Sequence, residues 1–114
     1  MFFKNFPIEE VKVLKDEVNQ REGEVVSKTL VQNEAISITL FAFSKGEEIG
    51  EHDSKGDAMV NVLEGEAIFT IAGKPYEVKA GESIIMPANI MHAVYAKSDF
   101  KMMLIVSFMG SKKW

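Results

Sequence analysis

Histidine is the residue type in this sequence best suited to metal ligation or acid–base chemistry, and it occurs only at His52 and His92. An imidazole has an unperturbed pKa of ~6.5, so it can ligate a metal, hydrogen-bond a ligand or exchange a proton near neutral pH. Cysteine is absent, which excludes a disulfide frame, a thiolate metal site and a cysteine nucleophile. No serine lies in the Gly-x-Ser-x-Gly context of a hydrolase nucleophile. Candidate chemistry therefore centres on the two histidines.

Both histidines lie in sequence that favours short β-strands. Apolar residues alternate with other residues between Ile36 and Phe43, and residues 67–71, 83–86 and 91–96 form short runs rich in apolar residues. Glycine, proline and asparagine turns interrupt these runs at short intervals, which is typical of an all-β sandwich or barrel.

The segments around the two histidines resemble the two sequence motifs of the cupin superfamily. Six residues carry the match: Gly46, His52 and Gly65 in the first motif, and Gly81, Pro87 and His92 in the second. The resemblance spans residues 34–108 and is to the small conserved-barrel subgroup with one histidine in motif one. It implies one all-β domain over residues 1–114, an RmlC-like cupin jelly-roll or double-stranded β-helix barrel of about ten strands. Residues 1–23 are expected to form an N-terminal strand or lid.

The resemblance implies an incomplete metal site. Fully liganded cupins bind a divalent transition metal inside the barrel through three histidines and one glutamate, whereas this sequence has Ser54 and Ala58 at two of those positions. Non-haem iron and manganese sites need at least three protein ligands, so two imidazoles alone make a weak site. Two alternatives stay open: no cofactor, or one divalent ion (Zn, Ni, Mn or Fe) at His52 and His92.

Strand alternation predicts which side chains surround the histidines. Residues of equal parity on a strand share one face, so the small and apolar residues expected around the pair are Ser54, Ala58, Val60, Met86 and Val94. The odd-numbered Glu51, Asp53 and Asp57 are expected to point away, although the turn before Asp57 could break this parity. Methionines in apolar strands are expected to fill gaps in the core rather than bind copper. The predicted interior is an apolar cavity with two polar contacts.

Two functions remain open at this stage. The first is binding of a small organic molecule, such as a sugar-like or carboxylate compound, with His52 and His92 as the polar contacts. The alternative is a metal-dependent cupin enzyme of the dioxygenase, isomerase or lyase kind that uses both histidines as ligands. The sequence assigns no catalytic residue.

Charge and hydropathy restrict the partners. A net charge of −4 argues against nucleic-acid binding, which needs a basic surface. No run of ~18 apolar residues is long enough to span a membrane, and the N-terminus lacks a signal-peptide pattern, so we expect a cytoplasmic protein. Two-sheet barrels leave strand edges that need covering, so we also expect a homodimer.

Overall fold

The protein folds as a barrel of two β-sheets, described here by a computed structural model over residues 2–108. This range contains nine strands and one short 3-10 turn. In chain order these are η1 (Leu14–Glu17), β1 (Val25–Gln32), β2 (Ile36–Phe43), β3 (Glu48–His52), β4 (Asp57–Glu64), β5 (Glu66–Ile71), β6 (Lys74–Lys79), β7 (Ser83–Met86), β8 (His92–Ala96) and β9 (Phe100–Ser107).

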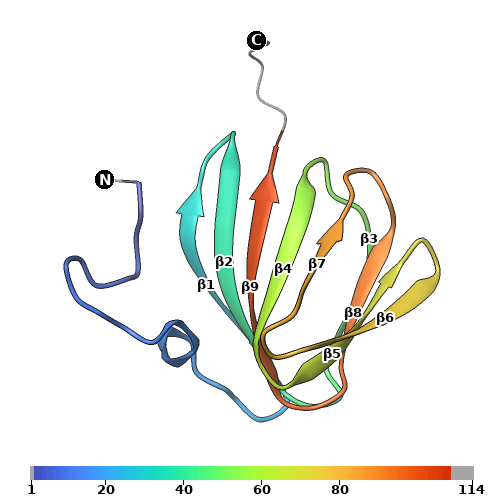
Figure 1. Cartoon of the computed structure of the whole chain (residues 1–114), viewed down its shortest axis with the longest axis horizontal. Helices are drawn as coiled ribbons and strands as arrows, with labels where there is room; N and C mark the ends of the chain where they lie inside the picture. The colour runs from blue at the N-terminus through green and yellow to red at the C-terminus, as the bar shows by residue number, and fades with distance from the viewer. Residues whose placement is uncertain (1, 109–114) are drawn as a thin grey trace.

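The strands form a five-stranded sheet in the order β1-β2-β9-β4-β7 and a four-stranded sheet in the order β3-β8-β5-β6 (Figure 1). Every pair of neighbouring strands is antiparallel. Strands far apart in the sequence, such as β2 and β9, therefore lie side by side. The jelly-roll barrel predicted from the sequence is confirmed, with nine strands in the described range rather than about ten.

Aromatic side chains fill part of the space between the sheets. Phe43, Phe69 and Phe100 are fully buried. The rings of Phe43 and Phe100 stack with centroids 4.6 Å apart, and Phe69 meets Phe100 edge-on at 6.3 Å. The rest of the interior contains the cavity described below, which is lined mainly by aliphatic and methionine side chains.

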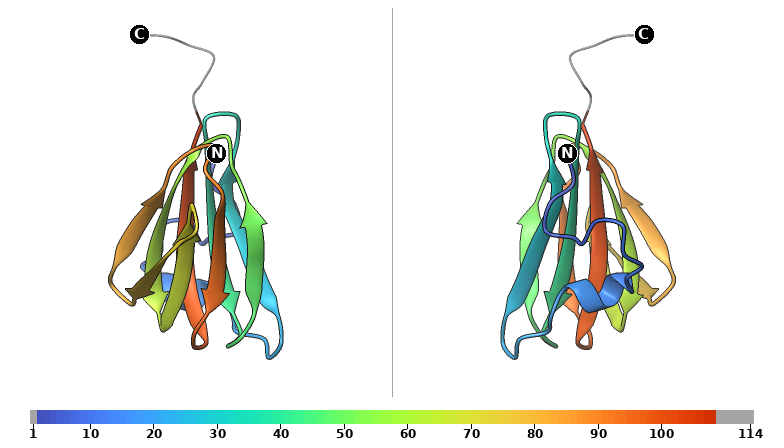
Figure 2. Two further views of the ribbon diagram at one scale, coloured as in Figure 1. Left: turned by 90° about the vertical axis from the view of Figure 1, so that its right-hand side faces the viewer. Right: turned by 90° about the vertical axis from the view of Figure 1, so that its left-hand side faces the viewer.

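Residues 2–23 form a strap over the outer face of the five-stranded sheet (Figure 2). The backbone amide of Lys4 donates to the carbonyl of Leu30 at 2.8 Å, and the Lys101 ammonium donates to the carbonyl of Lys15 at 2.8 Å. These residues contain no strand, because they pack across the sheet instead of extending its edge. Of the two expectations for this segment, a strand or a lid, the strand is therefore not formed within residues 2–23. The strap explains why Leu40 and Ala42 are buried on the face of β2 that points away from the interior.

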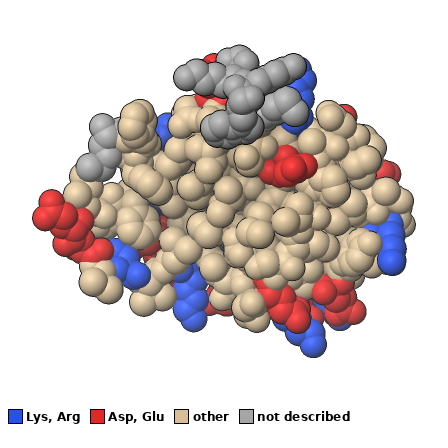
Figure 3. Space-filling model, turned by 45° about the horizontal axis from the view of Figure 1, so that its top comes forward, with Lys and Arg blue, Asp and Glu red and all other residues tan. Residues whose placement is uncertain are grey.

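In the view of Figure 3, most of the charged side chains lie near the outline of the molecule. This face has no extensive basic patch of the kind that nucleic-acid binding requires. No helix within residues 2–108 has the length and the apolar composition that are needed to cross a lipid bilayer.

Gly65, between β4 and β5, provides a test of the fold. Its φ is +73°, and a Cβ at this position would lie 2.1 Å from the carbonyl oxygen of Asp99. We expect Gly65→Ala to destabilise the protein by about 1–2 kcal/mol from the left-handed backbone and by a further ~1–3 kcal/mol from the steric clash. The free energy of unfolding from urea denaturation measures the total.

Gly73→Ala is the matched control, because Gly73 also has a positive φ of +82° but has no atom within 4 Å of the place that an added Cβ would occupy. It should lose only the backbone contribution. Equal losses in the two variants would show that the contact with Asp99 is unimportant.

Candidate functional site

A β-bulge in β3 places the two histidines opposite each other. Ile49 pairs with Val94, and a regular antiparallel ladder would then put Glu51 opposite His92. The register instead shifts before the end of β3, so that His52 pairs with His92. The extra residue also turns both Ile49 and His52 into the barrel, although they differ in parity.

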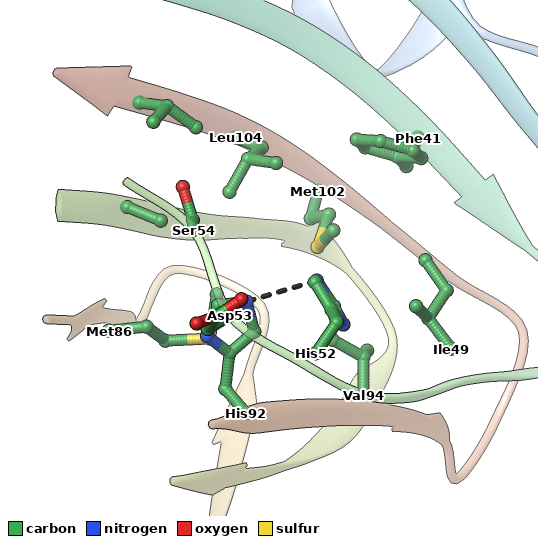
Figure 4. Close-up of a pocket in the computed structure, with 12 residues that line it drawn as sticks. Phe41, Ile49, His52, Asp53, Ser54, Met86, His92, Val94, Met102 and Leu104 are labelled. Atoms are coloured by element: carbon green, nitrogen blue, oxygen red, sulfur yellow. Dashed lines mark hydrogen bonds between the residues drawn. The ribbon is translucent and has the colours of Figure 1, made fainter. Parts of the chain in front are cut away.

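The two imidazole rings are in direct contact. Their Nε2 atoms lie 3.0 Å apart, and the rings meet edge to face at 71° with centroids 4.3 Å apart (Figure 4). The Nδ1 atom of His52 lies 2.9 Å from the carbonyl oxygen of Gly50, and the Nδ1 atom of His92 lies 3.2 Å from that of Ile90. His92 is buried with 4% exposure, whereas His52 is exposed.

These contacts determine which ring nitrogens carry hydrogen. A carbonyl oxygen can only accept a hydrogen bond, so both Nδ1 atoms donate. In a neutral imidazole the other nitrogen is then an acceptor, and the two Nε2 lone pairs face each other across 3.0 Å. Such a pair is stabilised by an electron-poor group placed between or beside the nitrogens: a proton, a hydrogen-bond donor or a cation.

Burial lowers the pKa of His92 below its usual 6.5, and the neighbouring His52 ring lowers it further. The hydrogen bond to the Ile90 carbonyl and the charge of Asp53 act in the opposite direction but are the smaller effects. His92 is therefore neutral at pH 7, with its Nε2 available as an acceptor.

The histidine pair lies at an apolar cavity of about 300 Å³ between the sheets (Figure 4). Both sheets contribute to the wall, and the exposed His52 and Asp53 lie where the wall meets solvent. The lining residues are Phe41, Ile49, His52, Asp53, Ser54, Ala58, Met86, His92, Val94, Met102, Leu104 and Val106.

The structure brings six of the seven sequence-predicted site residues to this cavity. They are His52, Ser54, Ala58, Met86, His92 and Val94. Val60 is the exception: it is fully buried in the core but is not part of the cavity wall. Strand parity places Val60 inside the barrel correctly, but Val60 lies in the packed core and not at the cavity wall.

The expectation that Asp53 points away is wrong. Asp53 lines the cavity because β3 ends at His52, and alternation no longer applies in the loop that follows. Asp57, by contrast, accepts a hydrogen bond from the amide of Ala88 at 2.7 Å and is not a lining residue.

Sequence reasoning also missed several apolar lining residues. Three of them alternate along β9: Met102, Leu104 and Val106. Their period of two was visible in the sequence. The pairing of β9 with β4, which brings them beside Ala58, was not visible because it joins distant segments.

Two loops are tied together at the rim of the cavity. The amide of Asn89 donates to the carbonyl of Ser54 at 2.7 Å, while the Ser54 hydroxyl accepts from the amide of Gly56 at 3.2 Å. Asn89 has a φ of +61°, a left-handed conformation that asparagine tolerates. Ser54 therefore helps to hold the rim.

The described residues do not form the ligand set that a hard divalent ion needs. Within residues 2–108 no group of three or more histidine, aspartate or glutamate side chains is arranged to hold a metal ion. The two imidazoles alone fall short of the three protein ligands typical of non-haem iron.

Comparison with known proteins agrees with this architecture. Residues 39–108 match the family described as the cupin domain. The chain belongs to the cupin family. Among curated proteins, no match is found.

Three solved structures illustrate the relationship of this cupin to others. A conserved protein of unknown function from Streptococcus pyogenes is 41% identical, with a TM-score of 0.95 and 97% of each chain covered. A cupin superfamily protein from Desulfitobacterium hafniense is 32% identical, with a TM-score of 0.90 and coverage of 94% of this chain and 98% of that one. A cupin 2 conserved barrel domain protein from Leptotrichia buccalis is 46% identical, with a TM-score of 0.79, over 81% of this cupin but only 45% of the longer chain.

The lowered pKa of His92 predicts a pH-dependent stability in metal-free protein. In the unfolded chain His92 binds a proton below its usual pKa of 6.5, whereas in the folded protein it does so only at lower pH. The unfolded state therefore binds more protons in this window, and the free energy of unfolding falls as the pH drops below 6.5. Thermal unfolding from about pH 7.5 to about pH 5.5, which brackets the titration of histidine, measures the effect.

His92→Gln should flatten this dependence, because glutamine does not titrate. His52→Gln is the comparison variant and should retain much of it, since burial is the largest cause of the shift at His92. A wild-type stability that is constant over this window, or that rises toward acid, would contradict the prediction.

Proposed function

We propose that this cupin binds a small organic molecule with an apolar body and a hydrogen-bond donor. The observation that carries the proposal is the pair of Nε2 acceptors, 3.0 Å apart, at the wall of an otherwise mainly apolar cavity. The cavity volume of about 300 Å³ is at the lower end of the range for small-molecule sites, ~300–1,000 Å³.

The donor chemistry follows from the tautomers. Because both Nδ1 atoms are engaged with backbone carbonyls, the rings present acceptors to the cavity. A hydroxyl group can donate to either Nε2, and its binding would separate or bridge the two facing lone pairs. A carboxylate is a poor ligand here, since it is itself an acceptor and Asp53 already adds a negative charge to the wall.

A metal-dependent enzyme is the second candidate, and one observation favours it. Each ring donates its Nδ1 hydrogen to a backbone carbonyl, which is the usual outer-shell arrangement of metal-ligating histidines. A divalent ion would be held by His52 and His92, with its other positions open to water or to an added ligand, and would supply Lewis-acid chemistry.

The homodimer expected from the sheet edges stays a prediction.

Three ring compounds of similar size test the proposal. Phenol has a donor, toluene has no polar group and benzoate has only acceptors. We expect phenol to bind about five- to tenfold more tightly than toluene, as one net hydrogen bond provides, and benzoate to bind most weakly. NMR titration with ¹⁵N-histidine follows both the affinity and the Nε2 signals of the two rings.

Ala58→Leu should block phenol binding, because Ala58 lines the cavity and is 2% exposed. Met59→Leu is the matched control from the same strand, since Met59 is partly exposed and does not line the cavity. Toluene or benzoate binding as tightly as phenol would count against the donor-binding site, as would unchanged Nε2 signals on saturation with phenol.

A further inference from the structure

The polar groups of the cavity wall are mostly hydrogen-bond acceptors. The Nε2 atoms of His52 and His92 are acceptors in the tautomers described above, and the carboxylate of Asp53 adds further acceptor oxygens. Among the lining residues only Ser54 has a hydroxyl group, and its oxygen already accepts a backbone hydrogen bond. The polar part of a ligand in this cavity therefore has to supply several donors.

Asp53 also gives the cavity wall a negative charge. No lysine or arginine is among the residues that line the cavity within the described range. The same range contains four ion pairs, and none of them includes Asp53. The charge of Asp53 acts on the histidine pair, because it raises the pKa of His92 against the larger effect of burial. This carboxylate is thus placed to compensate a positive charge beside the two rings.

The polar and apolar parts of the cavity are separate. In Figure 4, Asp53 is grouped with the two histidines, whereas Met102 and Leu104 extend from the opposite sheet. His52 and Asp53 are exposed, so the polar end is the part of the cavity that meets solvent. A charged group bound there keeps part of its hydration, which lowers the cost of taking it out of water.

We propose that the ligand's donor group is a protonated primary amine, held by the Nε2 atoms of His52 and His92 and by the carboxylate of Asp53. This inference rests on the proposed function and names the class of ligand within it: an amine with an apolar body. An ammonium group has three N–H donors and a positive charge, so it suits both facing lone pairs and the carboxylate. A hydroxyl group has one donor and no charge.

Other charged groups fit this end of the cavity less well. A carboxylate brings more acceptors and is repelled by Asp53. A quaternary ammonium has the positive charge but no N–H, so it leaves the two lone pairs, 3.0 Å apart, without a donor. The net charge of −4 attracts any cation to the protein, so a test has to separate the carboxylate of Asp53 from the overall charge.

Calorimetric titration of the full chain at neutral pH with three benzyl compounds tests the amine. Benzylamine, which is protonated under these conditions, benzyl alcohol and benzyltrimethylammonium share one apolar ring. We expect benzylamine to bind about five- to tenfold more tightly than benzyl alcohol, because hydrogen bonds to a charged donor are stronger than neutral ones. Benzyltrimethylammonium should bind at least about fivefold more weakly than benzylamine, since it has no donor.

Asp53→Asn identifies the contribution of the carboxylate. It should weaken benzylamine binding about three- to tenfold, because the charge pair is partly exposed to solvent. Benzyl alcohol should be affected by less than about twofold, which also shows that the cavity of the variant is intact. Glu51→Gln is the matched control: it removes the same charge from an exposed residue two positions away that does not line the cavity. It should change both affinities by less than about twofold.

Three outcomes would overturn the amine inference. They are benzylamine binding no more tightly than benzyl alcohol, benzyltrimethylammonium binding as tightly as benzylamine, and equal losses of benzylamine affinity in Asp53→Asn and Glu51→Gln. If benzyl alcohol and phenol still bind in those cases, only the amine is removed and the donor-binding site proposed above stands. Failure of all these compounds to bind would overturn both.

Discussion

The chemistry of this barrel depends on one extra residue in β3. The β-bulge between Ile49 and His52 brings two imidazoles into direct opposition, where a regular ladder would have placed Glu51 opposite His92. With a glutamate there, the pair would be a carboxylate and an imidazole, with opposite charges and complementary donors and acceptors. The bulge produces two matched acceptors instead, and the proposed binding of a hydrogen-bond donor depends on this arrangement.

The rest of the structure holds that arrangement in place. Backbone carbonyls at Gly50 and Ile90 orient the rings, and the rim loops are joined through the carbonyl of Ser54 and the carboxylate of Asp57. None of these interactions requires a bound ligand. The site is therefore largely preorganised, which would reduce the entropy cost of the binding proposed above.

Packing on both faces of the five-stranded sheet allows the interior to contain a cavity. A cavity loses dispersion contacts that a filled core would make. The stacked rings of Phe43 and Phe100 fill another part of the interior, and the N-terminal strap buries Leu40 and Ala42 on the opposite face of the sheet. Burial outside the barrel thus adds to the stability of a fold whose centre is partly empty.

The sequence by itself determined the β-fold, its family and the two histidines, because alternation and turn residues are local signals and the motif residues occur at readable spacings. Alternation also identified Ala58, Met86 and Val94, since each lies within a regular strand. Tertiary structure alone decided that Asp53 and Ile49 reach the cavity, that Val60 does not, and that Met102 lies opposite the histidines. A bulge shifts parity, a strand end cancels it, and contact between two sheets joins residues distant in the chain. None of these three effects is contained in a local pattern of residues.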